Sequence, residues 1–382
     1  MKYLILIVAA VSAHGQTSAP APLPSPPVTG PLTMLPPATF DAGPLGELAF
    51  NGILSGIGLA QSNHFADDDG AHADLSNGQL WVQKTDGWWQ FYVQAGAYNF
   101  LPLGTPFLHT NDTLSDFYGP VPVAYVKLAP TKDTAILAGA LPTILGAESA
   151  FTFQNMNIER GLLWNQENTV DRGIQVIQTV GKVTASLSWN DGYYSNRYSW
   201  LSGSLGYANG PHSLLFEAMG NLGQTAFQTT ATPVQNNSRM YAAIYTYTKG
   251  AWIVQPYMQF SDVPRNEKIG IANGAGTRGG AVLLSHGFKH GFSLAGRWEY
   301  LATTGSGVLN LLYGPGSEAT SLTVTPTFQA GGFFVRGDVS WVHARDYAAG
   351  DAFGATGNKA NQVRAVAEFG FIFGNNIAPK RP

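Results

Sequence analysis

The feature of the sequence that most constrains the fold is a recurring alternation of apolar and polar residues in short stretches. In residues 183–189, for example, the odd positions are Val, Ala, Leu and Trp, and the even positions are Thr or Ser. The same alternation recurs in residues 89–97, 292–300, 333–341 and 363–373. A period of two, with β-branched and aromatic enrichment, indicates strands that have one apolar and one polar face. Counting weaker examples, we expect about 14 to 16 strands, each close to the length of about 9 to 11 residues that a tilted strand needs to cross a bilayer.

A soluble all-β protein would show the same alternation, but the composition favours a membrane barrel. Charged residues make up 12% of the chain, about half of the roughly 25% that is usual in soluble domains. The polar faces carry mainly Ser, Thr, Gln and Gly. Because lipid offers the backbone no hydrogen-bond partners, a spanning sheet must close on itself. Several strands end in aromatic residues, as is typical of a bilayer interface, namely Trp189, Trp298, Tyr300, Trp341 and Phe373. We therefore predict an all-β fold, a transmembrane antiparallel β-barrel, with a soluble β fold as the alternative.

Two prolines test the assignment of strands. Pro256 and Pro326 both fall within stretches that we assign to strands. Proline lacks the N–H group that a central strand donates, and a closed barrel has no edge strand to accommodate it. Each proline therefore predicts either a β-bulge or a wrong assignment at its position.

The first residues are typical of a secretory signal peptide. Lys2 precedes an apolar run from Leu4 to Val11, and Ala13 and Gly15 are the small residues that a signal peptidase requires. We expect cleavage before Gln16. The apolar run is too short to cross a bilayer as a helix, and no later apolar run reaches the required length.

The rest of the chain divides into three parts by composition. Residues 16–45 are rich in proline, and we expect an extended, unpacked periplasmic segment that acts as a spacer or as a docking motif for a Pro-recognising domain. Residues 46–373 carry the alternation and form one barrel domain. Residues 374–382 are a C-terminal tail, and residues 1–15 are the signal peptide.

Three blocks of unusual composition give the chain a resemblance to a known family. They are FYVQAGAY at residues 91–98, FTFQNMNIERGLLWNQEN at residues 151–168 and SLSWNDGYYSNRYSWLSGS at residues 186–204. With these blocks the sequence resembles the OmpL-like β-barrel porin family of bacterial outer membranes, over essentially the whole predicted barrel. The resemblance implies an outer-membrane location and passive transport, and it supplies no catalytic residues. One departure is that a tail follows Phe373, whereas outer-membrane barrels commonly end on an aromatic residue.

One long stretch, residues 141–171, interrupts the alternation of the predicted strands. Aromatic and aliphatic residues alternate there irregularly with charged ones. A long stretch without strand periodicity inside a barrel is typically functional. We expect a loop or short helix that folds into the lumen and narrows the pore; an external cap that packs on its own aromatic residues is the alternative.

Charged residues on this stretch and on three late strands are the candidate pore-lining residues. In transmembrane barrels, charges on the face away from lipid point into the lumen, where they tune selectivity. The alternative is that each arginine is neutralised by the carboxylate two or four positions away on its own strand and only braces the wall. The candidates are Glu159, Arg160, Glu167 and Asp171 on the stretch, and Arg297, Glu299, Arg336, Asp338, Arg364 and Glu368 on the strands.

Other motifs carry no chemistry that we would assign. The aspartates of residues 65–74 offer oxygen ligands but lack the spacing of a calcium loop, and His64 and His72 lack the spacing of a zinc site. Residues 274–279 match a Gly-rich dinucleotide pattern, but an expected strand follows them where a helix is required. No G-x-S-x-G nucleophile motif occurs. We expect no cofactor and no metal.

The sequence therefore predicts a porin, an outer-membrane protein that forms a water-filled channel for passive diffusion of small hydrophilic solutes and ions. The expected partners are outer-membrane lipids, small polar solutes and ions, and further copies of the chain, for example in a trimer. The absence of cysteine excludes disulfides and thiolate sites, and the formal net charge of −3 gives no indication of nucleic-acid binding. An outer-membrane barrel enzyme, such as a lipase or protease, or a substrate-specific binding barrel is the alternative.

Overall fold

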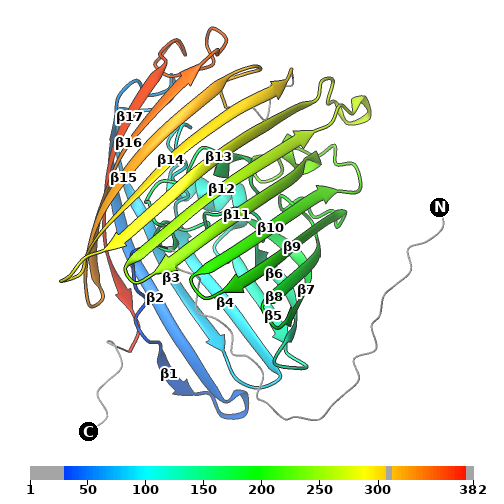
Figure 1. Ribbon diagram of the computed structural model, residues 1–382, viewed down its shortest axis with the longest axis vertical. Coiled ribbons are helices and arrows are strands. Elements are labelled where there is room, and N and C mark those ends of the chain that lie inside the picture. The colour runs from blue at the N-terminus through cyan, green and yellow to red at the C-terminus, as the bar shows by residue number, and fades with distance from the viewer. Residues whose placement is uncertain (1–29, 307–311, 376–382) are drawn as a thin grey trace.

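Sixteen strands close into an antiparallel barrel in the computed structural model, which describes residues 30–306 and 312–375. Strands β2 to β17 each pair with the next strand along the chain, and β17 pairs with β2 to close the barrel (Figure 1). The additional short strand β1 pairs with β2. Because the barrel is closed, no spanning strand has an unpaired edge. The backbone groups of such an edge would find no hydrogen-bond partner in lipid. The predicted all-β barrel of about 14 to 16 strands is thus confirmed.

The strands are β1 (Ala38–Asp41), β2 (Glu47–Gln61), β3 (Ala71–Lys84), β4 (Trp89–Tyr98), β5 (Val123–Leu128), β6 (Thr134–Pro142), β7 (Val170–Val180), β8 (Val183–Asn190), β9 (Trp200–Asn209), β10 (His212–Asn221), β11 (Arg239–Lys249), β12 (Trp252–Val263), β13 (Ala275–Gly287), β14 (Phe292–Gly305), β15 (Glu318–Ala330), β16 (Phe333–Arg345) and β17 (Asn361–Phe373). The helical turns are α1 (Thr110–Thr113), η1 (Gly43–Leu45), η2 (Leu114–Tyr118), η3 (Thr152–Gln154), η4 (Leu163–Gln166), η5 (Val234–Asn237) and η6 (Glu267–Ile269). None of the helices in the described part of the chain has the length and apolar character needed to cross a membrane.

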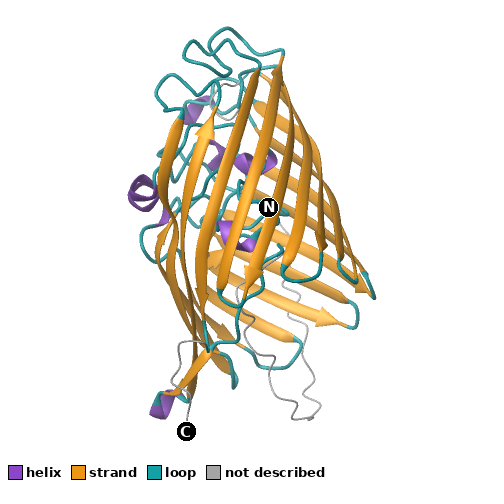
Figure 2. Ribbon diagram, turned by 90° about the vertical axis from the view of Figure 1, so that its left-hand side faces the viewer, coloured by secondary structure: helices purple, strands orange, loops and turns teal. Residues whose placement is uncertain are grey.

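The connections differ sharply between the two ends of the barrel. At one end, here called the turn end, the β7–β8 and β9–β10 connections are residues 181–182 and 210–211. At the other end, here called the loop end, the β4–β5 and β6–β7 connections are residues 99–122 and 143–169. Figure 2 shows longer loops extending from the upper end of the barrel. Short periplasmic turns and longer extracellular loops are the pattern of bacterial outer-membrane barrels.

Side chains alternate between the two faces of the wall as the period of two predicts. Leu187 and Val339 are each 59% exposed, whereas Ser188 and Ser340 on the same strands are buried. The predicted aromatic residues Trp189, Trp298 and Trp341 are likewise exposed on the outer face. The outer wall is therefore apolar and the inner wall polar, the reverse of a soluble protein.

The two prolines lie within strands, but neither introduces a bulge. At Pro256 the β11–β12 pairing is interrupted between Ile244↔Tyr257 and Tyr247↔Val254, and the register is the same on both sides of the interruption. The β15–β16 pairing is interrupted in the same way at Pro326. The strand assignment was right and the predicted bulge was wrong. On its other side each proline pairs in register with the neighbouring strand, Pro256 with β13 and Pro326 with β14. A residue in a non-hydrogen-bonded pair donates no N–H to the strand opposite, so proline is accommodated there.

The Pro-rich segment packs against the turn end at Leu32, so the expectation of an unpacked segment was wrong there, whereas Phe40 of β1 and Leu45 of η1 are exposed. Leu32 is 3% exposed and belongs to a cluster of buried apolar residues that includes Phe153 and Phe334. Gln329 Nε2 donates to Thr33 O, and Thr33 N donates to Gln329 Oε1, both at 2.8 Å. The prediction was based on the high proline content and did not consider that apolar residues such as Leu32 lie between the prolines.

Other parts of the predicted domain division fall outside the described residues. These parts are the signal peptide at residues 1–15, residues 16–29 of the Pro-rich segment and residues 376–382 of the tail. The start of the tail is described, and Asn375 N donates to Pro36 O at 2.8 Å. The start of the tail therefore contacts the Pro-rich segment at the turn end.

Replacing Leu187 by Arg should destabilise the barrel by about 2 to 4 kcal/mol, because Leu187 faces lipid near the middle of β8. The matched control is Ser186→Arg, which places the same charge on the inner face one residue away and should cost much less. Urea unfolding in lipid vesicles measures both. Equal destabilisation by the two substitutions would contradict the assigned facing.

Candidate functional site: an inserted segment inside the barrel

The connection between β6 and β7, residues 143–169, lies inside the barrel and is called here the inserted segment. Every residue from 151 to 164 is buried, and the segment contains the short turns η3 and η4. Part of the β4–β5 loop runs beside it: Leu103 N donates to Arg160 O at 2.9 Å, and Arg160 N donates to Leu101 O at 3.1 Å. The segment thus occupies the lumen, as predicted, and does not form an external cap.

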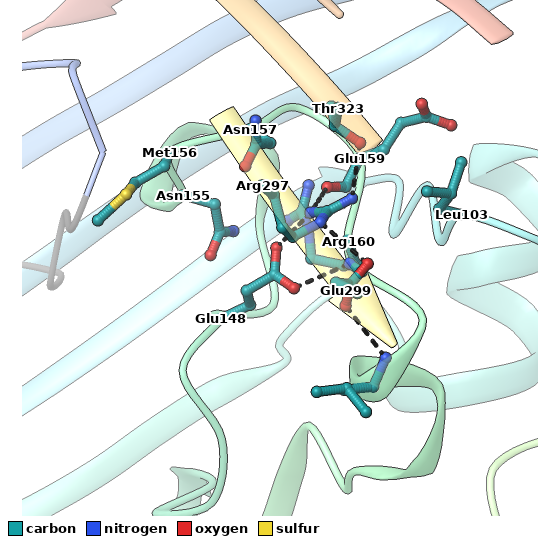
Figure 3. A network of polar contacts seen from close by, with 12 residues as sticks. Leu103, Glu148, Asn155, Met156, Asn157, Glu159, Arg160, Arg297, Glu299 and Thr323 are labelled. Atoms are coloured by element: carbon teal, nitrogen blue, oxygen red, sulfur yellow. Dashed lines mark hydrogen bonds and ion pairs between the residues drawn. The ribbon is translucent and has the colours of Figure 1, made fainter. Parts of the chain in front are cut away.

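On β14, Arg297 and Glu299 bind the inserted segment from the wall (Figure 3). Arg297 Nη1 donates to Glu148 Oε1 and to Glu159 O, both at 2.7 Å. Glu299 accepts hydrogen bonds from the backbone N–H groups of Leu162 at 3.0 Å and Leu163 at 3.3 Å. Strand β14 therefore binds the inserted segment with both charges: Arg297 donates to its oxygen atoms, and Glu299 accepts from its backbone N–H groups.

On β16, Arg336 and Asp338 repeat this arrangement two strands away. Asp338 Oδ2 accepts from Ile158 N at 2.9 Å and from Glu159 N at 2.8 Å. Arg336 donates to three backbone carbonyls of the segment, those of Thr152 (3.0 Å), Asn155 (2.9 Å) and Met156 (3.0 Å). Hydrogen bonds to a charged group contribute more than neutral ones, about 1.5 to 3 kcal/mol each, so these residues fix the path of the segment.

On β17, Arg364 and Glu368 are the third pair of charged wall residues that bind the inserted segment. Arg364 Nη1 lies 3.3 Å from Glu159 Oε1, and Thr152 Oγ1 donates to Glu368 Oε1 at 2.7 Å. Arg364 also donates to Pro102 O at 3.0 Å and to Thr105 O, so it holds the β4–β5 loop as well. Three strands thus anchor the inserted segment through buried charges.

Two of the three wall arginines do not pair with the carboxylate on their own strand, although the alternative interpretation of the sequence predicted that they would. Arg297 does pair with Glu299, at 3.1 Å. Arg336 pairs instead with Glu368 of β17 at 3.5 Å, and Arg364 pairs with Glu159 of the inserted segment. The reason is that Arg336 and Glu368 are direct cross-strand partners, and such partners are closer than residues two apart on one strand.

All ten candidate residues face the interior and are buried, but they fall into two groups. The three arginines, their partner carboxylates and Asp338 hold the inserted segment, and Arg160 lies within it. Glu167 and Asp171 lie elsewhere, and neither is in an ion pair within the described residues. Asp171 Oδ2 accepts from Asn168 Nδ2 at 3.2 Å, and Glu167 lies against Gly146.

Two of the cavities inside the barrel lie beside the inserted segment. One has a volume of about 310 Å³, and its lining includes Ser213 and Gln255 near the turn end. The other has a volume of about 370 Å³, and its lining includes Phe107 and Thr230 from loops at the loop end. Thr169 lines both cavities. The two cavities therefore approach each other where the inserted segment rejoins β7.

Two carboxylates of the site were missed by the analysis of the sequence. Glu148 lies in the inserted segment and pairs with Arg297, and Glu217 lies on β10. The signal for Glu217 was present, because Leu214, Phe216 and Ala218 mark the outer face of β10 and place Glu217 on the inner face. Nothing in the local sequence distinguishes Glu148 from the other charges of the segment.

The acidic loop at residues 65–74 has a structural role among the described residues. Asp68 accepts from Gln61 Nε2 at 2.8 Å and from Phe107 N at 3.0 Å, and it lies 2.7 Å from His72 Nε2. Its oxygens are thus occupied by the protein. Within residues 30–306 and 312–375, no three His, Asp or Glu side chains are grouped so that they could hold a metal ion.

Replacing Arg336 by Gln should destabilise the barrel by about 3 to 5 kcal/mol, because it removes the bonds to the segment and leaves Glu368 buried without its partner. The control is Arg345→Gln on the same strand, which breaks an exposed pair with Glu318 and should cost at most about 1 kcal/mol. Urea unfolding and limited proteolysis of the inserted segment measure the effect. A protease-resistant segment and equal stabilities would show that Arg336 does not anchor it.

Solved structures with a similar fold are outer-membrane proteins. The outer membrane channel DcaP of Acinetobacter baumannii has a TM-score of 0.58 at 11% identity, over 88% of this chain and 100% of that chain. OmpT of Vibrio cholerae has a TM-score of 0.57 at 11% identity, over 87% and 100%. OmpF of Salmonella typhi, solved with daunomycin, has a TM-score of 0.57 at 11% identity, over 86% and 98%. At this identity the likeness shows the fold alone.

The family is shown by the sequence comparison. No curated protein sequence gives a significant match. Residues 47–373, however, match the model of the family described as "Putative beta-barrel porin-2, OmpL-like". This match spans the barrel from β2 to the last residue of β17, and with the fold it implies a location in the outer membrane. The chain therefore belongs to the OmpL-like family of β-barrel porins.

Proposed function

We propose that the barrel is a passive channel that lets small hydrophilic solutes and ions diffuse across the outer membrane. The observation that carries this proposal is the pair of interior cavities, one toward each end of the barrel, that share Thr169 beside the inserted segment. A solute passing this point would move between the segment and the wall formed by β10 and β11. The family supports the same function.

The interior chemistry supports a hydrated path. Polar side chains such as Gln94, Ser213, Thr246 and Gln255 line the turn-end cavity, where they can bind water or a polar solute. The inserted segment fills the side of the barrel nearest β14, β16 and β17, so the path is confined to the opposite side. Such a narrow path limits permeation to small solutes.

The proposed partners are outer-membrane lipids, small polar solutes and ions, and further copies of the chain. The apolar outer face supports lipid contact. Self-association, for example as a trimer, is supported by the unequal height of the wall: β5 and β8 have 6 and 8 residues, whereas β13 to β17 have 13 or 14. Strands that are short for the bilayer can be accommodated by oligomerisation. The proposal assigns no chemical reaction and no cofactor to the protein.

The purified protein should conduct ions in planar bilayers and make liposomes leak small sugars, with a rate that falls as the sugar becomes larger. Deleting residues 155–168 should raise the conductance, because those residues occupy the lumen. Deleting residues 265–270, which form part of a loop at the loop end, should leave it nearly unchanged. A folded protein that neither conducts nor leaks would contradict the proposed function, and substrate turnover would favour a barrel enzyme.

A further inference from the structure

Glu167 is a buried carboxylate for which the structure provides no partner. Its residue is 6% exposed, and neither carboxylate oxygen has a hydrogen-bond partner among the described residues. Burying a charge without a partner is costly, and buried polar groups are nearly always satisfied by protein, water or an ion. When it is ionised, the carboxylate can be satisfied by a partner from the solvent, such as water or a cation.

The backbone at Gly146 brings a second carboxylate to the same place. Glu217 Oε2 of β10 accepts a hydrogen bond from Gly146 N at 2.7 Å. A methyl group on Gly146 would lie 1.9 Å from Glu167 Oε2, and the φ angle of Gly146 is +91°. The positive φ angle favours glycine here, and a side chain at this position would displace the Glu167 carboxylate. Glu167 and Glu217 both contact it, one from the inserted segment and one from the wall.

The charges around Glu167 leave an excess of negative charge. The carboxylates of Glu148, Glu217 and Glu299 all act on Glu167. The nearby cation Arg297 is already paired with Glu148 and Glu299. Glu167 and Glu217 are in no ion pair within the described part of the chain. A positive charge that entered this gap would be attracted by both.

The gap lies where the two cavities approach each other. Glu167 and Thr169 line the loop-end cavity, and Gly146 and Thr169 line the turn-end cavity. A solute moving between the cavities would therefore pass the Glu167 carboxylate. The anchoring arginines cannot oppose it there, because Arg336 and Arg364 are bound to the segment on the far side of the barrel interior.

We propose that Glu167, with Glu217, forms a transient binding site for small monovalent cations and makes the channel prefer cations to anions. The inference rests on the proposed channel function. Two carboxylates without further ligands bind a cation weakly, which permeation requires, because an ion that binds too tightly does not leave. Consistent with a transient site, no group of three ligands suited to a resident metal lies within the described residues.

The state of Glu167 should depend on pH. Burial raises the pKa of Glu167 well above its usual value, and the carboxylates of Glu148, Glu217 and Glu299 raise it further. Because the pKa is raised, the side chain is neutral at low pH and becomes charged as the pH rises beyond the usual range of glutamate. The other titratable groups that face it are Tyr193 from the β8–β9 loop and Tyr257 from β12.

The test is the reversal potential of single channels in a KCl gradient, which gives the ratio of cation to anion permeability. Even at the dielectric constant of water, a unit charge about 5 Å away changes the occupancy of a cation about fourfold. At a pH high enough to ionise Glu167, the wild type should prefer cations, and Glu167→Gln should lower the permeability ratio by about this factor. Glu217→Gln should act in the same direction. Glu267→Gln, which removes an exposed charge at the loop end, should leave the ratio nearly unchanged.

A pH series adds a readout that a purely structural role would not change. The cation preference of the wild type should increase as the pH rises, and the increase should be smaller in Glu167→Gln. If wild type and all variants conduct with the same ratio at every pH, the proposed cation site is refuted while the channel remains. If no variant and no wild-type sample conducts, the channel function itself is refuted. If Glu167→Gln alone does not conduct, Glu217→Gln provides the decisive ratio.

Discussion

The docking of the inserted segment by buried charges is the interaction on which the interior of this barrel depends. Arg297, Arg336 and Arg364 lie on β14, β16 and β17 and bind backbone carbonyls or carboxylates of the segment and its neighbouring loop. The segment supplies N–H groups to Glu299 and Asp338 in return. A segment with few regular backbone hydrogen bonds of its own can lie inside the barrel because the wall satisfies its polar groups.

In the proposed channel, this docking also determines which charges are available to solutes. The arginines are neutralised by their partners, so the wall that carries most of the charge contributes little net field to the open side of the barrel. Two carboxyl groups that are in no ion pair within the described residues, those of Glu167 and Glu217, lie on the opposite side beside Gly146. We therefore propose that residues on the anchored side have a structural role and that residues on the open side determine selectivity.

The sequence predicted the wall well and the interior only in part. Alternation at residues such as Leu187 and Val339 specifies the facing of each strand, because the side-chain period of two is a local property. The lumen placement of the segment followed from its lost periodicity. Its partners did not, because pairs such as Arg364 with Glu159 join residues about two hundred positions apart. Pro256 and Leu32 show two further limits. Two successive residue pairs can be missing from a β-ladder without a bulge, and a Pro-rich segment can still bury an apolar residue.

The most direct test of a continuous path past the inserted segment uses Thr169, which lines both cavities. The chain contains no cysteine, so a single Thr169→Cys substitution gives a unique thiol without background. In sealed vesicles that hold the protein in one orientation, small membrane-impermeant thiol reagents should label this cysteine from either side, and bulky reagents should not. A thiol that is unreactive from both sides, or that reacts from one side only, would contradict a channel that runs between the segment and the β10–β11 wall.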